Sequence, residues 1–142
     1  MTKTHGPVSV LVAEDDDEYF ELLKELMDEA GFGPRVQRFA NGEELMTFLS
    51  ARGRNQAATV IMMDLNMPRK TGYEALKEIR ANPDLRRIPV VMMTVSSDPM
   101  DIARCYESGA NSYITKPFDF TQLLETLKVF RQYWIEKVTL PV

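Results

Sequence analysis

Five short apolar runs alternate with five longer amphipathic stretches along this chain. The short runs are rich in Val, Ile and Met and are bounded by polar or turn residues, which is typical of buried β-strands. They cover residues 8–13, 35–39, 59–64, 89–94 and 111–115. The longer stretches place apolar residues at helical spacing over residues 16–30, 42–52, 72–81, 99–108 and 119–137.

Strands that alternate with helices predict an α/β fold in which the strands are parallel and the helices cover both faces of the sheet. We expect a doubly wound five-stranded sheet with the strand order 2-1-3-4-5. This order places the first and third strands side by side at the centre. Ligands of such sheets bind beyond the carboxyl ends of the strands, where the strand order reverses.

Chemically active side chains follow four of the five predicted strands. Glu14 and Asp15 follow VSVLVA, Asp64 follows TVIMM, Thr94 ends IPVVMMT, and Lys116 follows NSYIT. Because the carboxyl ends of parallel strands lie at one edge of the sheet, we expect these side chains to form one pocket.

Composition narrows the classes of function. The chain has 142 residues, a net charge of −4, one cysteine (Cys105) and one histidine (His5). A disulfide, a cysteine-rich metal site and a Ser-His-Asp triad are therefore excluded within this chain. The acidic balance argues against nucleic-acid binding, and no apolar run is long enough to span a membrane. The first residues lack a signal peptide pattern, so we expect a cytoplasmic location.

The three acids predict a divalent cation site. Glu14, Asp15 and Asp64 would repel one another at close range, and Mg²⁺ with its preference for oxygen ligands would relieve that repulsion. Acids at a helix start also stabilise the helix dipole, which is the simpler interpretation of Glu14 and Asp15 taken alone. Beside Mg²⁺, Asp64 could attack a phosphorus atom, while Lys116 and Thr94 could bind the phosphoryl oxygens.

The motifs VAEDD, MMDLNMPRKTG, VVMMTVSS and SYITKPF resemble, in order and spacing, those of the receiver domains of two-component response regulators. The resemblance covers about residues 8–130 and implies the flavodoxin-like receiver fold. It implies that a histidine kinase phosphorylates Asp64. It also implies that Asp15, Asp64 and the main-chain carbonyl of Asn66 bind Mg²⁺ directly, with Glu14 acting through water.

The same resemblance implies a switch that changes a surface upon phosphorylation. Thr94 and Tyr113 match the family's switch pair, so the face formed by the last two helices and the strand between them should carry the signal. The family pattern also implies a cis peptide bond before Pro117. Val95 departs from the pattern, because a small residue usually follows the switch threonine, and we expect altered kinetics from it.

The chain end suggests how the signal is passed on. We divide the chain into a disordered tail (1–7), a receiver domain (8–130) and a C-terminal extension (131–142). One alternative is that the extension packs back on its own domain. The other is that it forms a homodimer interface. The residues assigned to that interface are Phe130, Tyr133, Trp134 and Ile135.

The ending FRQYWIEKVTLPV resembles the tail of small response regulators that pair with phytochrome-type histidine kinases. It implies such a kinase as phosphodonor. By family analogy, residues near the start of the first helix would dock the kinase, although the apolar ones could equally be core. These residues are Asp16, Tyr19, Phe20 and Leu23.

We expect a signalling protein and not an enzyme with an external substrate. Two alternatives stay open: a receiver-like protein-binding module that is never phosphorylated, and an aspartyl-nucleophile phosphatase. The phosphatase is disfavoured because such enzymes carry a second acid two residues after the nucleophile, where this chain has Asn66. The sequence does not identify the downstream protein partner.

Overall fold

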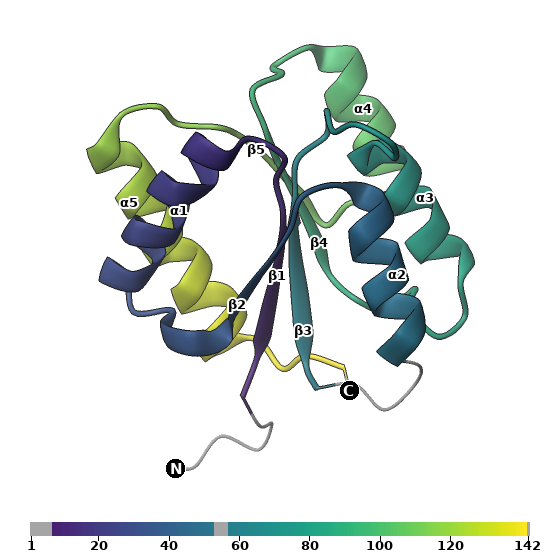
Figure 1. Ribbon diagram of the computed structural model, residues 1–142, viewed down its shortest axis with the longest axis horizontal. Helices are drawn as coiled ribbons and strands as arrows, with labels where there is room; N and C mark the ends of the chain where they lie inside the picture. The colour runs from purple at the N-terminus through teal and green to yellow at the C-terminus, as the bar shows by residue number, and fades with distance from the viewer. Residues whose placement is uncertain (1–6, 53–56, 142) are drawn as a thin grey trace.

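A five-stranded parallel sheet forms the centre of the protein (Figure 1). The computed structural model describes residues 7–52 and 57–141. The strand order is β2-β1-β3-β4-β5, which confirms the predicted order 2-1-3-4-5. The strands are β1 (Ser9–Ala13), β2 (Val36–Phe39), β3 (Thr59–Met63), β4 (Val90–Thr94) and β5 (Ser112–Thr115).

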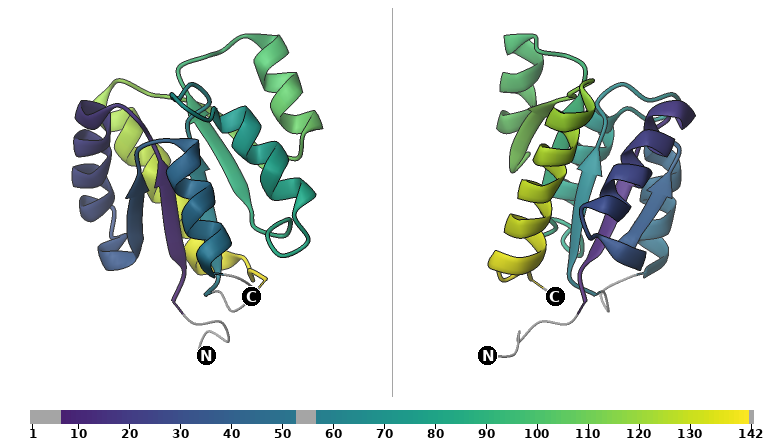
Figure 2. Two further views of the ribbon diagram at one scale, coloured as in Figure 1. Left: turned by 45° about the vertical axis from the view of Figure 1, so that its right-hand side comes forward. Right: turned by 90° about the vertical axis from the view of Figure 1, so that its left-hand side faces the viewer.

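Helices cover both faces of this sheet. Helices α1 (Asp17–Glu29) and α5 (Phe120–Arg131) lie side by side on one face (Figures 1 and 2). Helices α2 (Gly42–Arg52), α3 (Gly72–Ala81) and α4 (Pro99–Glu107) lie on the other face (Figure 1). A short 3-10 helix, Gly33–Arg35, precedes β2, and a π-helical segment, Gln132–Lys137, continues α5.

Alternate residues of the central strands supply two hydrophobic cores. Val10 and Val12 of β1 point toward α1 and α5, whereas Leu11 and Ala13 point toward the helices of the other face. Every residue of β3 and β4 is buried. These strands are covered on both faces, which explains why their sequences are continuous apolar runs and not alternating ones.

The sheet register brings the ends of β1 and β3 level with each other. Ala13 pairs with Met63, and the main-chain nitrogen of Asp64 donates to the carbonyl oxygen of Ala13 at 3.0 Å. The residues that follow, Glu14 and Asp64, therefore leave the sheet at the same edge. The backbone register alone therefore brings Glu14 and Asp64 to the edge where the pocket is predicted.

The structure describes the predicted parts of the chain to different extents. The predicted N-terminal tail (1–7) lies, apart from Pro7, outside the described residues. In the predicted extension, Ile135 and Leu140 are buried in the same core as Phe130 of α5. Among the described residues, no helix combines the length and the apolar character that crossing a membrane requires.

Candidate phosphoacceptor pocket

The pocket at the carboxyl edge of the sheet is built around one buried ammonium group. Lys116 Nζ lies 2.7 Å from Glu14 Oε1 and 2.8 Å from Asp64 Oδ2. All three residues are buried, with 8%, 2% and 7% of their surfaces exposed, respectively. The structure therefore brings together three of the side chains that the sequence placed at separate strand ends.

Charge pairing keeps Lys116 protonated in this setting. Burial lowers the pKa of Lys116, but its hydrogen bonds to Asp64 and Glu14 outweigh burial and raise the pKa above its ordinary value. Lys116 thus presents a permanent positive charge at the sheet edge. A compact ammonium in this place can bind the oxygens of an anionic ligand.

The geometry of the three acids fits a divalent cation site. Glu14, Asp15 and Asp64 each offer a carboxylate oxygen, and these oxygens all lie within 4.8 Å of one another. Burial raises the pKa of Glu14 to about 7, and the charge of Asp64 adds to the rise, whereas Lys116 opposes it. The single Lys116 ammonium therefore neutralises only part of the negative charge of the three acids. A hard divalent cation fits an all-oxygen set of this kind.

Asn66, the fourth predicted ligand, lies in the loop after β3. Its main-chain nitrogen donates to Asp64 Oδ1 at 3.4 Å, which is a weak hydrogen bond. This contact helps to orient the Asp64 carboxylate. The role of the Asn66 carbonyl as a metal ligand stays a prediction.

A close approach between the first residue of α3 and the backbone that follows β3 constrains the position of Asp64. A Cβ atom on Gly72 would lie 2.0 Å from the carbonyl oxygen of Asp64, so only glycine fits at this position. Thr71 and Glu74 form a reciprocal capping box at the start of α3, which fixes the helix beside the pocket. Sequence reasoning noted the motif around Gly72 but not this contact.

Thr94 offers a hydroxyl that the protein itself does not use. Thr94 is fully buried at the end of β4, and its Oγ1 has no hydrogen-bond partner among the described residues. A buried hydroxyl without a partner is costly, which suggests that a ligand completes the site. This observation fits the predicted role of Thr94 in binding phosphoryl oxygens.

Tyr113, the second predicted switch residue, points toward the loop between β4 and α4. Its hydroxyl donates to the carbonyl oxygen of Ser96 at 2.9 Å, and the Ser96 hydroxyl donates to Asp101 of α4 at 2.6 Å. Burial raises the pKa of Tyr113, which keeps the phenol neutral and able to donate. The tyrosine is thereby connected to the first turn of α4. Switching itself stays a prediction.

The peptide bond before Pro117 differs from the expectation. All peptide bonds among the described residues are trans, so the predicted cis bond is wrong for this structure. Lys116 still donates its main-chain N–H to the carbonyl oxygen of Thr94 at 2.8 Å. This hydrogen bond keeps Lys116 in register with β4, and the side chain reaches both carboxylates with a trans bond.

The four residues near the start of α1 divide into two groups. Tyr19 and Leu23 are buried, with 6% and 1% of their surfaces exposed, so these two residues belong to the hydrophobic core. Asp16 is exposed and caps the helix by accepting a hydrogen bond from the main-chain nitrogen of Tyr19 at 3.1 Å. Phe20 is partly buried beneath Arg38.

Tyr19 contacts the pocket, a role that the sequence did not suggest. Its ring centroid lies 4.3 Å from Lys116 Nζ. No sequence signal distinguishes this tyrosine from an ordinary core residue of an amphipathic helix, because its partner lies almost one hundred residues away.

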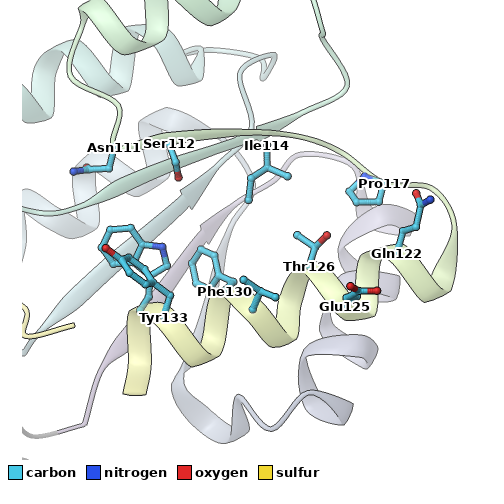
Figure 3. Close-up of a pocket in the computed structure, with 11 residues that line it drawn as sticks. Asn111, Ser112, Ile114, Pro117, Gln122, Glu125, Thr126, Phe130 and Tyr133 are labelled. Atoms are coloured by element: carbon cyan, nitrogen blue, oxygen red, sulfur yellow. The ribbon is translucent and has the colours of Figure 1, made fainter. Parts of the chain in front are cut away.

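A second hollow lies beside β5 and α5 (Figure 3). It is an open groove of about 890 Å³, which we call the α5 groove. Its lining is mostly apolar, and it includes Asn111, Ser112, Ile114, Pro117, Gln122, Glu125, Thr126, Val129, Phe130, Tyr133 and Trp134.

The residues predicted to form a dimer interface are distributed unevenly around this groove. Phe130 and Ile135 are buried in the core of their own chain, with 4% and 5% of their surfaces exposed. Trp134 is partly buried against that core, whereas Tyr133 is 53% exposed. Of the four residues, Tyr133 is therefore the one most available to a partner.

Known proteins share both the sequence pattern and the fold of this chain. The family described as response regulator receiver domain matches residues 10–128. The chain belongs to this family. Response regulator Rcp1 of Synechocystis sp. is 33% identical to this receiver domain protein over 142 residues, which cover 98% of this chain and 97% of Rcp1.

Solved structures of receiver domains resemble this one closely. The crystal structure of the phosphorylated cyanobacterial phytochrome response regulator RcpA has a TM-score of 0.85 and 32% identity, covering 98% of this chain and 100% of RcpA. The Mn²⁺-bound form of Rcp1 has a TM-score of 0.82 and 34% identity, covering 96% of this chain and 100% of that one. The receiver fold and the two-component family are thus confirmed.

Proposed function

We propose that this protein is a response regulator that accepts a phosphoryl group on Asp64 with the help of Mg²⁺. The observation that carries the proposal is the Lys116 ammonium between Glu14 and Asp64, together with the unpartnered hydroxyl of Thr94 at the end of β4. These groups offer an oxygen nucleophile, a cation and a hydrogen-bond donor at one edge of the sheet. Membership of the receiver family supports the same chemistry.

The transfer requires little covalent chemistry from the protein. An Asp64 carboxylate oxygen forms a bond to phosphorus while the bond from phosphorus to the donor nitrogen or oxygen breaks, and the leaving group keeps that electron pair. Lys116 and Thr94 bind the phosphoryl oxygens and offset their charge. Mg²⁺, held by Asp15, Asp64 and the Asn66 carbonyl with Glu14 acting through water, would neutralise further negative charge.

Intact-mass spectrometry with acetyl phosphate and Mg²⁺ tests this proposal. We expect one added phosphoryl group in the wild type, none in Asp64→Asn, and none in the presence of EDTA. Asp28→Asn, an exposed acid on α1, is the matched control and should behave as the wild type.

An absent adduct has two explanations that beryllofluoride separates. If beryllofluoride binds the wild type, the phosphoryl group is lost by fast hydrolysis. If it does not bind either, the protein is not phosphorylated at Asp64, and the binding-module alternative becomes the better account.

We propose a phytochrome-type histidine kinase as the phosphodonor. The support is the similarity to RcpA, which is a phytochrome response regulator, and to Rcp1. Phosphotransfer from a panel of histidine kinases should show the fastest transfer from a phytochrome-type kinase. A clear preference for a kinase of another class would contradict the pairing.

We also propose that two copies associate through the α5 groove and carry the signal on the surface formed by α4, β5 and α5. The support is the exposed aromatic Tyr133 beside the partly buried Trp134, because aromatic residues are enriched in interfaces. Light scattering at micromolar concentration should report a dimer. Tyr133→Ser should weaken it, whereas Tyr73→Ser on the opposite face should not.

A further inference from the structure

One tyrosine of α1 contacts three consecutive residues of the loop between β5 and α5. The Tyr19 ring lies 4.3 Å from Lys116 Nζ, and its hydroxyl donates to the carbonyl oxygen of Pro117 at 3.2 Å. The ring also meets Phe118 edge to face, with 5.9 Å between the ring centroids.

We propose that Tyr19 is a positioning residue for Lys116, one that holds the ammonium where phosphoryl oxygens bind. The proposal rests on the phosphorylation of Asp64 proposed above. It assigns to α1 a part in the anion site that is separate from the acids at the start of that helix.

The physical need for such a contact follows from the lysine side chain. A lysine carries its charge on a flexible four-carbon stem, so its position must be set by its contacts. Glu14 and Asp64 supply two of these contacts, but both are also candidate metal ligands. The face of an aromatic ring attracts a cation without being a metal ligand. Tyr19 can therefore hold Lys116 whichever ions the carboxylates bind.

The surroundings of Tyr19 strengthen this contact. Only 6% of its surface is exposed, and cation–π attraction is stronger where water is excluded. Burial raises the pKa of the Tyr19 phenol, and the charges of Glu14 and Asp64 add to the rise. The hydroxyl thus stays protonated and can donate to Pro117.

Two substitutions separate the ring from the hydroxyl. Tyr19→Phe keeps the ring over Lys116 and loses the hydrogen bond to Pro117, whereas Tyr19→Leu loses both. Leu26→Ala is the matched control for stability, because Leu26 is a buried residue of the same helix and the same core. Its cavity destabilises the protein without changing the pocket.

The first measurement is the mobility of the lysine side chain itself. In ¹³C NMR relaxation measurements on the metal-free protein, the order parameter of Lys116 Cε should be high in the wild type. We expect it to stay high in Tyr19→Phe and Leu26→Ala and to fall in Tyr19→Leu. An unchanged order parameter in Tyr19→Leu would overturn the proposal.

The second measurement is ligand affinity. With saturating Mg²⁺, ¹⁹F NMR titration should show beryllofluoride binding about three- to tenfold weaker in Tyr19→Leu and within about twofold of wild type in Tyr19→Phe. Mg²⁺ affinity, measured by calorimetry, should change less than about twofold in both variants. Equal weakening in Leu26→Ala would assign the effect to stability and overturn the positioning role.

The two proposals fail in different ways. A wild type that binds no beryllofluoride and accepts no phosphoryl group contradicts the proposed function. The lysine signal in the metal-free protein depends on neither ligand, so it still decides whether Tyr19 holds Lys116.

Discussion

The Asp64 pocket and the α5 groove are both next to strand β5, but they differ in the kind of side chain that lines them. In the Asp64 pocket oppositely charged groups contact each other directly, with Lys116 Nζ 2.7 Å from Glu14 Oε1 and 2.8 Å from Asp64 Oδ2. The α5 groove offers about 890 Å³ and is lined mainly by apolar and aromatic groups. The pocket is arranged for one small anion and one cation, whereas the groove is arranged for contact area.

This difference predicts how each region responds to substitution. In the pocket a few charged groups contact one another directly, so a single change should abolish chemistry. In the groove many side chains share the contact, so single changes should be graded. Four predictions test whether the two regions differ in this way.

The largest effect should follow from Lys116→Met. The variant removes the only cation that contacts both buried carboxylates among the described residues. Loss of one charge-stabilising donor typically slows catalysis about 10²- to 10³-fold, and we expect phosphorylation by acetyl phosphate to slow by this factor. Quantitative intact-mass spectrometry over time gives the rate.

Lys128→Met provides the control for this change. Lys128 is an exposed lysine of α5 outside both regions, and its removal should leave the rate unchanged. A Lys116→Met rate within about threefold of wild type would show that the pocket does not depend on single atoms.

The C-terminal extension should show a contrast within itself. Ile135 is 5% exposed and packs in the core, so Ile135→Ala should lower the free energy of unfolding by about 3 kcal/mol. Tyr133 is 53% exposed, so Tyr133→Ala should change it by less than about 0.5 kcal/mol. Urea denaturation followed by the fluorescence of Trp134, the only tryptophan, measures both. Equal destabilisation would show that the two side chains are packed alike.

The sequence predicted the strand ends well because their signals are local. Each chemically active residue directly follows an apolar run, and parallel pairing brings those ends to one edge whatever the loops do. Glu14, Asp64 and Lys116 accordingly meet as expected. The predicted strand 59–64 and the observed β3, Thr59–Met63, differ by one residue.

The C-terminal extension was harder to predict because its helix changes type. The helical spacing over residues 119–137 predicts 3.6 residues per turn throughout, but Gln132–Lys137 is π-helical. The main-chain nitrogen of Val138 donates to the carbonyl oxygen of Tyr133, five residues earlier. Wider turns rotate the later side chains away from the directions that a regular α-helix would give them. Regular helical spacing therefore does not predict that Ile135 is buried and Tyr133 is exposed.

The run of acids after β1 should contain one sensitive position and one tolerant one. Asp15 is a candidate metal ligand, so Asp15→Asn should weaken Mg²⁺ binding about ten- to hundredfold. Asp17 lies two residues on, is 84% exposed and pairs with Arg38 at 2.7 Å, so Asp17→Asn should change the affinity less than about twofold. Isothermal titration calorimetry measures both. Similar losses in the two variants would indicate a general effect of charge, without a defined cation site.

The smallest effect should be the energetic coupling between the two regions. Strand β5 connects them, because Ser112 and Ile114 line the groove and Lys116 enters the pocket. If both regions bias one equilibrium of the protein, beryllofluoride with Mg²⁺ should tighten self-association about fivefold, near the lower end of typical allosteric couplings. Sedimentation equilibrium with and without beryllofluoride gives the two dissociation constants. By linkage, dimer formation must then tighten beryllofluoride binding at each of the two sites by the square root of that factor, about twofold, which a titration at two protein concentrations measures independently. A change seen in one direction only would reveal an error in one of the measurements.

No change in either direction would mean that the pocket and the groove act separately. The signal would then have to leave the pocket through α4, by way of Tyr113, Ser96 and Asp101.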